Sequence, residues 1–237
     1  MSAPMEHGHD TAAEFDTHAA VTRSMLGWGV LAGPIYLGVG LVLAVNRAGF
    51  DLSEHALSLL MLGDGGWMQR VNLLASGLIC GVAAVGFGRA MNRTGTSSRA
   101  PVLLLAFAIG LIASGIFPPD PVDGFPPGAE SEASASGILH LAFGAFGFAF
   151  LAAACFVAAR WITRRGDTGW SRYSRISGAA VLVGFVGGAA LSQYSVGVAL
   201  LWLAVVAGYA WIAATSVYLW RTVPHPDANR RGTRAAG

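Results

Sequence analysis

Long stretches without any charged side chain alternate with short polar segments along this chain. The hydrocarbon core of a bilayer is about 30 Å thick, and a helix needs roughly 20 apolar residues to cross it. One stretch covers 45 residues, enough for two crossings, and has a polar break at residues 192–195. We therefore predict an all-α integral membrane bundle of six transmembrane helices, forming one domain over residues 23–221. The stretches are residues 24–46, 71–88, 100–119, 133–159 and 176–220.

Polar segments flank this domain at both ends. Residues 1–22 hold His7, His9 and His18 among small and acidic residues, and they lack the basic start and apolar core of a cleavable signal peptide. We expect the first apolar stretch to act as an uncleaved anchor. We interpret residues 1–22 as a disordered cytoplasmic tail, with metal binding by the histidines as the alternative. Residues 222–237 form a second expected tail, Arg-rich, disordered and cytoplasmic.

The composition supports a membrane protein and excludes several partners. Only 12% of the residues are charged and 54% are hydrophobic, whereas an ordinary soluble domain has about 25% charged residues. The chain contains no lysine, which excludes any lysine-linked cofactor such as retinal or pyridoxal phosphate. The arginines lie beside the apolar stretches rather than in a nucleic-acid-binding stripe. The lipid bilayer is the expected partner, and the Gly- and Ala-rich, Lys-free composition is typical of a bacterial genome.

The arginines also give a predicted orientation. Thirteen of the fifteen fall at Arg23, in residues 89–99 and 160–175, and in the tail from Arg221. The positive-inside rule places these segments in the cytoplasm. We therefore expect a multi-pass protein of the plasma membrane, the inner membrane of a bacterial cell, with both termini cytoplasmic.

Small residues bear on how the predicted helices pack. Cys80 and Cys155 are expected at depths that differ by roughly 10–15 Å, so we predict two buried free thiols rather than a disulfide. Glycines four residues apart let helix backbones approach closely in lipid. They indicate either packing within one bundle or a homodimer through one Gly-rich face. The pairs are Gly29/Gly33, Gly77/Gly81 and Gly184/Gly188.

The segment between the first two apolar stretches contains a short predicted helix. Asp51 and Glu54 have the spacing of a capping box, and Gly63 suits a helix C-terminus. This helix is too short to span a bilayer and is expected at the interface or tucked among the spans. Glu54, His55 and Ser58 would form its polar patch.

A proline-rich segment precedes the fourth apolar stretch. Residues 117–127 contain five prolines, so we expect a stiff, extended cover. Asp120 lies in this segment, and His140 lies about two turns inside the following helix, on the same side of the membrane. A histidine inside a membrane span is a functional hypothesis by default. We predict a polar outer-leaflet pocket formed by Asp51, Ser53, Glu54, Ser58, Trp67, Asn72, Asp120 and His140.

At these residues the chain resembles an uncharacterised bacterial and archaeal membrane family, the domain of unknown function 998. The resemblance covers roughly residues 25–220. It implies a six-helix membrane fold and carries no established reaction. The motifs that support it are residues 53–55 (Ser-Glu-His), Trp67 with Asn72, residues 117–121 (Phe-Pro-Pro-Asp-Pro) and residues 137–140 (Gly-Ile-Leu-His).

Three roles stay open for the predicted pocket. The first is binding of a lipid or other lipophilic molecule by its polar head. The second is hydrolysis at the outer leaflet, with Glu54, His55, Asp120 and His140 as catalytic candidates. In that case His55, Asp120 and His140 are also candidate ligands of a metal such as zinc. The third is a purely structural role, in which the polar residues only hold the outer loops on the bundle.

Other chemistries fit the sequence less well. Serine catalysis through Ser53, Ser58 or Ser136 lacks a recognisable nucleophile motif. Haem ligation would rest on His55 and His140 alone, both expected near one surface. Transport lacks its usual signs, which are charged residues within the spans and Pro-broken helices.

Overall fold

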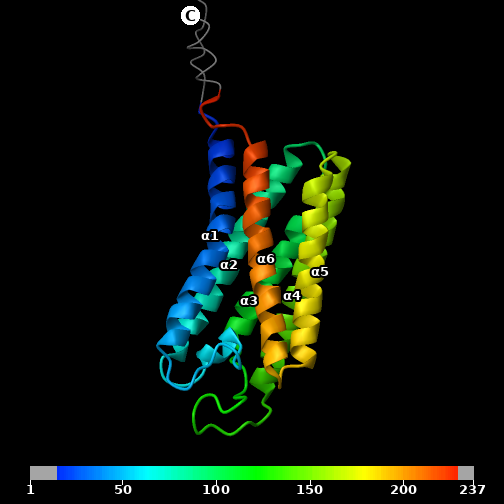
Figure 1. The fold of residues 1–237 in the computed structure, drawn as a ribbon. Helices are drawn as coiled ribbons and strands as arrows, with labels where there is room; N and C mark the ends of the chain where they lie inside the picture. Colours follow the sequence, from blue (N-terminus) through cyan, green and yellow to red (C-terminus); the bar gives the residue numbers. More distant parts are fainter. Residues whose placement is uncertain (1–14, 229–237) are drawn as a thin grey trace, which may run out of the picture.

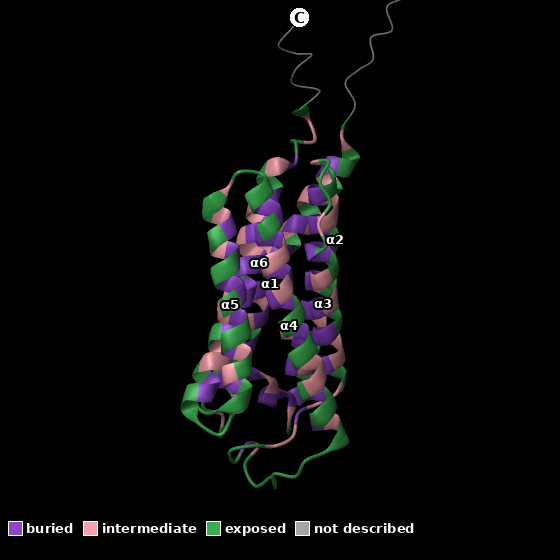
Figure 2. Cartoon of the chain, turned by 90° about the vertical axis from the view of Figure 1, so that its right-hand side faces the viewer, coloured by how far each residue is buried: buried purple, intermediate pink, exposed green. Residues whose placement is uncertain are grey.

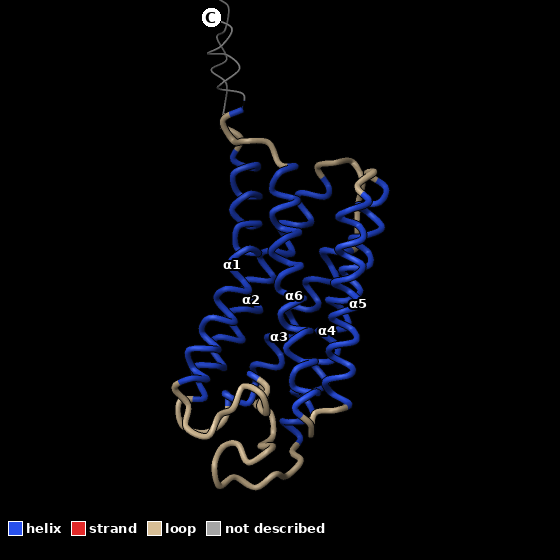
Figure 3. The backbone as a smooth tube through the Cα atoms, viewed as in Figure 1, coloured by secondary structure: helices blue, strands red, loops and turns tan. Residues whose placement is uncertain are grey.

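The computed structural model describes residues 15–228, and this part of the chain is an all-helical bundle (Figure 1). The predicted all-α fold class is confirmed. The helices are joined by turns and by two longer loops, as Figure 3 shows. Their bounds are α1 Thr17–Val45, α2 Gly66–Asn92, α3 Ala100–Ile116, α4 Ala135–Arg164, α5 Thr168–Ala190 and α6 Ser195–Thr222, and a short 3₁₀ helix, η1, covers Leu57–Met61.

Five of the α-helices in the described part of the chain are long and apolar enough to cross a membrane. The exception is α3 with 17 residues. Its length corresponds to about 26 Å, against a hydrocarbon core of about 30 Å. Pro101 in its first turn and Pro118 just beyond its end limit its extension. The several span-like helices indicate a multi-pass membrane protein.

The helices form a closed arrangement in which each packs against its neighbour in the sequence and α6 returns to pack against α1. Both described chain ends lie at one end of the bundle, which we call the terminal end. The two longer loops, residues 46–65 and 117–134, lie together at the opposite end, which we call the long-loop end (Figure 1). α2 also contacts α6, so α1, α2 and α6 share an interior.

Many large apolar residues of the bundle are exposed. Figure 2 shows exposed residues on the outer faces of the helices and buried residues towards the interior. Leu78 of α2 is 63% exposed, Ile109 of α3 59% and Val183 of α5 63%. Many of the fully buried residues are alanines. Apolar outer faces and small interior residues are typical of helices that contact lipid on one side and each other on the other side.

Glycines of the predicted packing pairs lie where helices of this chain approach closely. A Cβ on Gly77 would lie 2.9 Å from the Ala108 carbonyl oxygen of α3. One on Gly184 would lie 2.7 Å from the Leu200 carbonyl oxygen of α6. These glycines therefore serve packing within the bundle. Both cysteines are buried free thiols, as predicted.

At the terminal end, the first helix starts earlier in the sequence than the predicted end of the N-terminal tail. α1 begins at Thr17 rather than at residue 23, because the Asp16 carboxylate accepts a hydrogen bond from the Ala19 N–H and caps the helix. That bond, together with an ion pair at 3.1 Å to Arg93, the residue that follows α2, lowers the pKa of Asp16. The rest of the expected tails, residues 1–14 with His7 and His9 and residues 229–237, lies outside the described residues.

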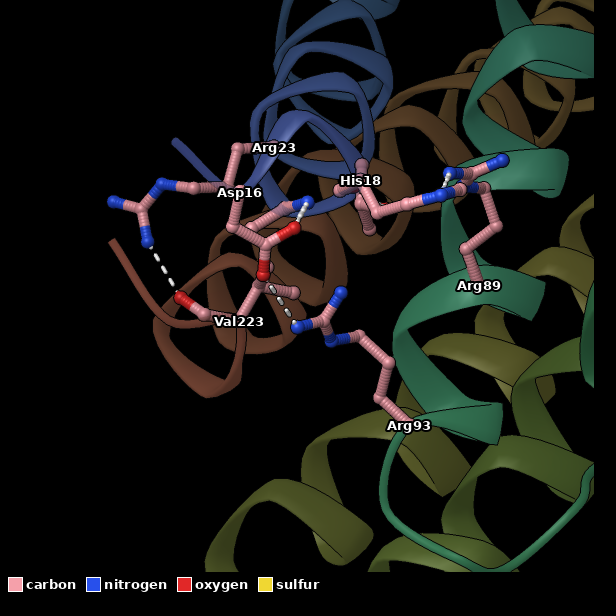
Figure 4. Close-up of polar contacts among 8 residues, drawn as sticks. Asp16, His18, Arg23, Arg89, Arg93 and Val223 are labelled. Carbon is pink, nitrogen blue, oxygen red and sulfur yellow. Dashed lines mark hydrogen bonds and ion pairs between the residues drawn. The ribbon is translucent and has the colours of Figure 1, made fainter. Parts of the chain in front are cut away.

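Arginines join the helix ends at the terminal end, as Figure 4 shows. Arg23 of α1 donates to the Val223 carbonyl oxygen at 2.6 Å, and its guanidinium lies 3.4 Å from the centre of the Trp220 ring. Arg89 of α2 lies 3.1 Å from Nδ1 of His18 on α1. The start of α1 and the ends of α2 and α6 are therefore held in one polar network.

In the first long loop, the helix predicted over residues 51–63 is mostly not formed. Only η1 is helical there, and it packs against α1 and α2 with four apolar side chains buried. Asp51 accepts hydrogen bonds from the hydroxyl and the backbone N–H of Ser53, which lower the pKa of the Asp51 carboxyl. Glu54 is exposed and forms no capping box with Asp51 in the described chain. Local side-chain bonds of this kind compete with helix formation.

Candidate functional site

His55 joins the two long loops and is only 3% exposed. Its Nδ1 accepts the backbone N–H of Asp51 at 2.8 Å. The proton is therefore on Nε2, which donates to the Asp123 carbonyl oxygen at 3.2 Å. The ring also contacts Phe50 and Phe125, with 5.3 Å between ring centres in each case. Both nitrogens of this candidate catalytic residue are thus used to position loops.

Further contacts fix the same loops to each other and to the bundle. Arg47 donates to the Leu62 carbonyl oxygen, and its guanidinium lies 5.8 Å from the centre of the buried Phe125 ring. Trp202 of α6 donates its indole N–H to the Leu52 carbonyl oxygen at 3.2 Å. The second loop is therefore held on the first, and the first is held on α6.

Asp120 covers the start of α4. Its carboxylate accepts hydrogen bonds from the Ser134 hydroxyl and, at 3.1 Å, from the Ser134 N–H. The Ser134 hydroxyl in turn accepts the Gly137 N–H at 3.0 Å and caps the helix. A Cβ on Gly137 would lie 2.0 Å from an Asp120 oxygen, so only glycine fits beneath the carboxylate. A negative charge at a helix N-terminus is stabilised by the helix dipole.

His140 lies in the second turn of α4 and is 7% exposed. Its Nδ1 is 2.9 Å from the carbonyl oxygens of both Ser114 and Phe117, at the end of α3. Carbonyl oxygens only accept, so Nδ1 carries the proton. Among the described residues Nε2 has no hydrogen-bond partner. Its lone pair is therefore available to take a proton or to bind a ligand.

The structure does not gather the predicted site residues around one point. Among the described residues, no three His, Cys, Asp or Glu side chains lie close enough to hold a metal ion together. Asp120 and His140 are near enough to interact electrostatically, whereas Asn72 faces the bundle interior. The remaining pocket residues are Asp51, Ser53, Glu54 and Trp67, all exposed, and Ser58, which is half-buried.

A second polar group lies inside the bundle between α1, α2 and α6, and we call it the interior polar cluster. It consists of Tyr36, Gln69, Asn72, Ser76 and Tyr209, none more than 6% exposed. The Asn72 side-chain amide donates to the Tyr36 carbonyl oxygen and to Gln69 Oε1, each at 3.0 Å. The Tyr36 and Tyr209 rings are stacked with 5.1 Å between their centres. α2 thus contributes three neutral polar side chains to a helix interface.

Several buried atoms of this cluster have no hydrogen-bond partner within the described chain. They include three potential donors, Gln69 Nε2, Ser76 Oγ and Tyr209 OH, and the acceptor Asn72 Oδ1. The Ser76 and Tyr209 side chains are near enough to interact, but neither hydroxyl has a hydrogen bond within the described chain. An unpaired polar group away from water costs about 1–3 kcal/mol, and within a bilayer the cost is larger. The other unpaired buried atoms are Arg70 Nε, Thr215 Oγ1 and Ser216 Oγ.

Sequence reasoning found only one member of the interior polar cluster, Asn72. A signal for two others was present, because Gln69, Asn72 and Ser76 are spaced three and four residues apart and so share one helix face. Tyr209 lies in an otherwise apolar stretch of α6 and has no comparable neighbour pattern.

Comparisons with known proteins place the chain in a family. Neither the curated proteins nor the solved structures contain a match to it. A family model described as "Protein of unknown function (DUF998)" matches residues 30–218, which include all six α-helices in large part. The chain therefore belongs to this family of unknown function.

Proposed function

We propose that this chain is a six-span bacterial plasma-membrane protein that binds a lipophilic molecule by its neutral polar head. In this proposal α3 is the sixth span, and the terminal end faces the cytoplasm. The arginines support that orientation, since ten of the twelve arginines among the described residues belong to the segments at the terminal end. The binding site lies in the outer-leaflet half of the bundle, at the interior polar cluster rather than at the long loops.

The unpaired buried atoms of the interior polar cluster carry this proposal. Three donors and one acceptor, from α2 and α6, have no hydrogen-bond partner within the described chain. A hydroxyl group or an N–H-bearing amide group of a ligand can both accept from the donors and donate to Asn72 Oδ1, whereas a carbonyl group can only accept from the donors. The five side chains of the cluster carry no formal charge. A charged head would therefore be left uncompensated in a low-dielectric interior, which favours a neutral one.

Lipid mass spectrometry of the protein purified in mild detergent tests the proposal. The test variant combines Tyr209→Phe with Ser76→Ala, which removes two hydroxyls and keeps the shape of the core. Its control combines Tyr194→Phe with Ser192→Ala, which removes the same groups from exposed positions. We expect a defined molecule on the wild type and the control, and at least tenfold less on the test variant, since each lost hydrogen bond is worth about 1 kcal/mol. A wild-type protein that carries no defined molecule, or a test variant that retains it, contradicts the proposal.

A second candidate function is hydrolysis at the outer leaflet with His140 as general base. The observation that favours it is the unpaired Nε2 of His140, whose other nitrogen is held by two carbonyl oxygens. His55 and Asp120 would act only by positioning, because their polar atoms already hold loops and a helix end. Glu54 is exposed.

Replacing His140 by alanine separates the remaining interpretations. Hydrolysis predicts turnover of lipid esters or amides by the wild type and its loss in a variant that still folds. Elemental analysis of the same two proteins tests metal assistance. A variant that only unfolds at lower temperature, with no activity or metal to lose in the wild type, supports a structural role.

A further inference from the structure

The hairpin formed by α4 and α5 gathers positive charge at the terminal end. Within residues 160–175 the only acidic side chain is Asp167, and it caps α5 by accepting the Trp170 N–H at 3.1 Å. In the described chain no ion pair involves an arginine of this hairpin. The charge is therefore not neutralised by the protein itself. The arginines are Arg160, Arg164, Arg165, Arg172 and Arg175.

Two of these arginines flank a recess between the helices. The recess has a volume of about 380 Å³ and is lined by Phe156, Arg160 and Arg175. Arg175 donates to the Thr163 hydroxyl at 3.4 Å, which directs its guanidinium across the helix pair. The Phe156 ring lies against α5 because the facing residue is Gly178, where a Cβ would be 3.2 Å from the ring.

The two flanking arginines differ from the rest of the hairpin. Arg165 is stacked on the Trp161 ring with 4.8 Å from its guanidinium carbon to the ring centre, and Arg164 and Arg172 do not line the recess. Of the five arginines of this hairpin, only Arg160 and Arg175 line the recess, beside the Phe156 ring.

We propose that this recess binds the phosphate of an anionic phospholipid such as phosphatidylglycerol. Guanidinium groups bind phosphate oxygens through paired charge-assisted hydrogen bonds, and basic pockets between membrane helices hold lipid headgroups. The recess lies one turn inside the end of α4, since Arg160 precedes the last helical residue, Arg164, by four positions. Phe156 lies a further turn inside, where acyl chains begin, and Ile176 beside Arg175 is 61% exposed. These apolar neighbours favour a membrane lipid over a soluble phosphate compound. The site is independent of the interior polar cluster.

Lipid exchange into delipidated protein tests this site. The full-length protein in uncharged detergent is mixed with phosphatidylglycerol or phosphatidylcholine, and bound lipid is counted by native mass spectrometry. The test variant is Arg160→Gln with Arg175→Gln, and the control is Arg164→Gln with Arg172→Gln. Both lose two exposed charges from the same hairpin. Glycerol 3-phosphate serves as a headgroup competitor without acyl chains.

We expect the wild type and the control to bind phosphatidylglycerol in preference to phosphatidylcholine. The test variant should bind phosphatidylglycerol about 30-fold more weakly, because each of the two arginines contributes to the attraction. A matched variant, Arg160→Lys with Arg175→Lys, should retain the preference for the anionic lipid. Equal losses in the test and control variants would show diffuse charge attraction and overturn the proposal. Displacement by equimolar glycerol 3-phosphate would reassign the recess to a soluble phosphate compound.

Discussion

The polar residues of the long-loop end and those of the interior polar cluster behave in opposite ways. His55 and Asp120 are distinctive in the sequence, yet their polar atoms are bound by backbone groups and serine. Gln69, Ser76 and Tyr209 are inconspicuous neutral residues, yet each has an unpaired buried atom in the described chain. A rare or charged residue near a membrane span therefore does not necessarily have a polar atom that is free to bind a ligand.

The difference follows from what surrounds each group. Loops and helix ends offer free N–H and C=O groups, so polar side chains placed there find partners. In the middle of packed helices the backbone is already bonded to itself. A polar side chain there pairs only with another side chain, with water or with a ligand. His140 is intermediate, since one nitrogen uses the carbonyl oxygens at the end of α3 and the other has no partner among the described residues.

The largest expected loss of stability follows replacement of His55. Replacing it by alanine leaves the Asp51 N–H and the Asp123 carbonyl unpaired and removes a ring packed between Phe50 and Phe125. We expect a loss of about 3 kcal/mol, which corresponds to a fall in Tm of roughly 6–12 °C. Thermal unfolding in detergent measures it.

The neighbouring residue provides the control for His55. Glu54 is exposed, so Glu54→Ala should leave the Tm within about 1 °C of the wild type. A His55→Ala variant as stable as Glu54→Ala would remove the contrast between the long-loop end and the interior polar cluster. It would also reopen a catalytic role for His55.

A smaller effect is expected where Asp120 covers α4. In Gly137→Ala the new methyl group would overlap the Asp120 carboxylate, which lies 2.0 Å from the Cβ position. Displacing that carboxylate should cost about 1–3 kcal/mol. Gly169 in the first turn of α5 is the matched control, because its Cβ would lie 3.8 Å from Asp167, an ordinary contact. Gly169→Ala should leave the Tm unchanged or raise it, and equal losses in both variants would contradict the role given to Asp120.

The fold was more predictable from the sequence than the site. Charge-free stretches report burial in lipid directly, so the all-α fold and the positions of the helices could be predicted. The start of α1 was missed because the capping bond of Asp16 depends on one side chain in a polar segment. The helix over residues 51–63 was wrongly extended for a similar reason, since Ser53 and His55 bond locally to Asp51 and its N–H.

The interior polar cluster could be predicted only in part, because it depends on how three helices face each other. Gln69 and Ser76 share a face with Asn72 on α2, but nothing in the sequence pairs that face with Tyr209 of α6. The Tyr36 and Tyr209 rings, whose centres are 5.1 Å apart, are brought together by tertiary packing. Gly33 contributes to it, since a Cβ there would lie 3.0 Å from the Tyr209 Cβ.

The smallest expected effect on the Tm concerns the terminal end, where the ion pair between Asp16 and Arg93 is partly exposed to water. Asp16→Asn keeps a residue that caps helices well but removes the charge that pairs with Arg93. We expect the Tm at pH 7 to fall by about 1–2 °C, since exposed ion pairs contribute little.

The pH dependence gives this last prediction its sign. Hydrogen bonding from Ala19 and then Arg93 lowers the pKa of Asp16 in the folded protein below its usual value of 3.8. The stabilisation is therefore complete above that value and is lost as the pH falls through the lower folded-state pKa. The Tm difference between the wild type and Asp16→Asn should be present at pH 7 and shrink towards zero as the pH falls below the folded-state pKa of Asp16. A difference that is unchanged in acid would mean that Asp16 acts through its shape rather than its charge.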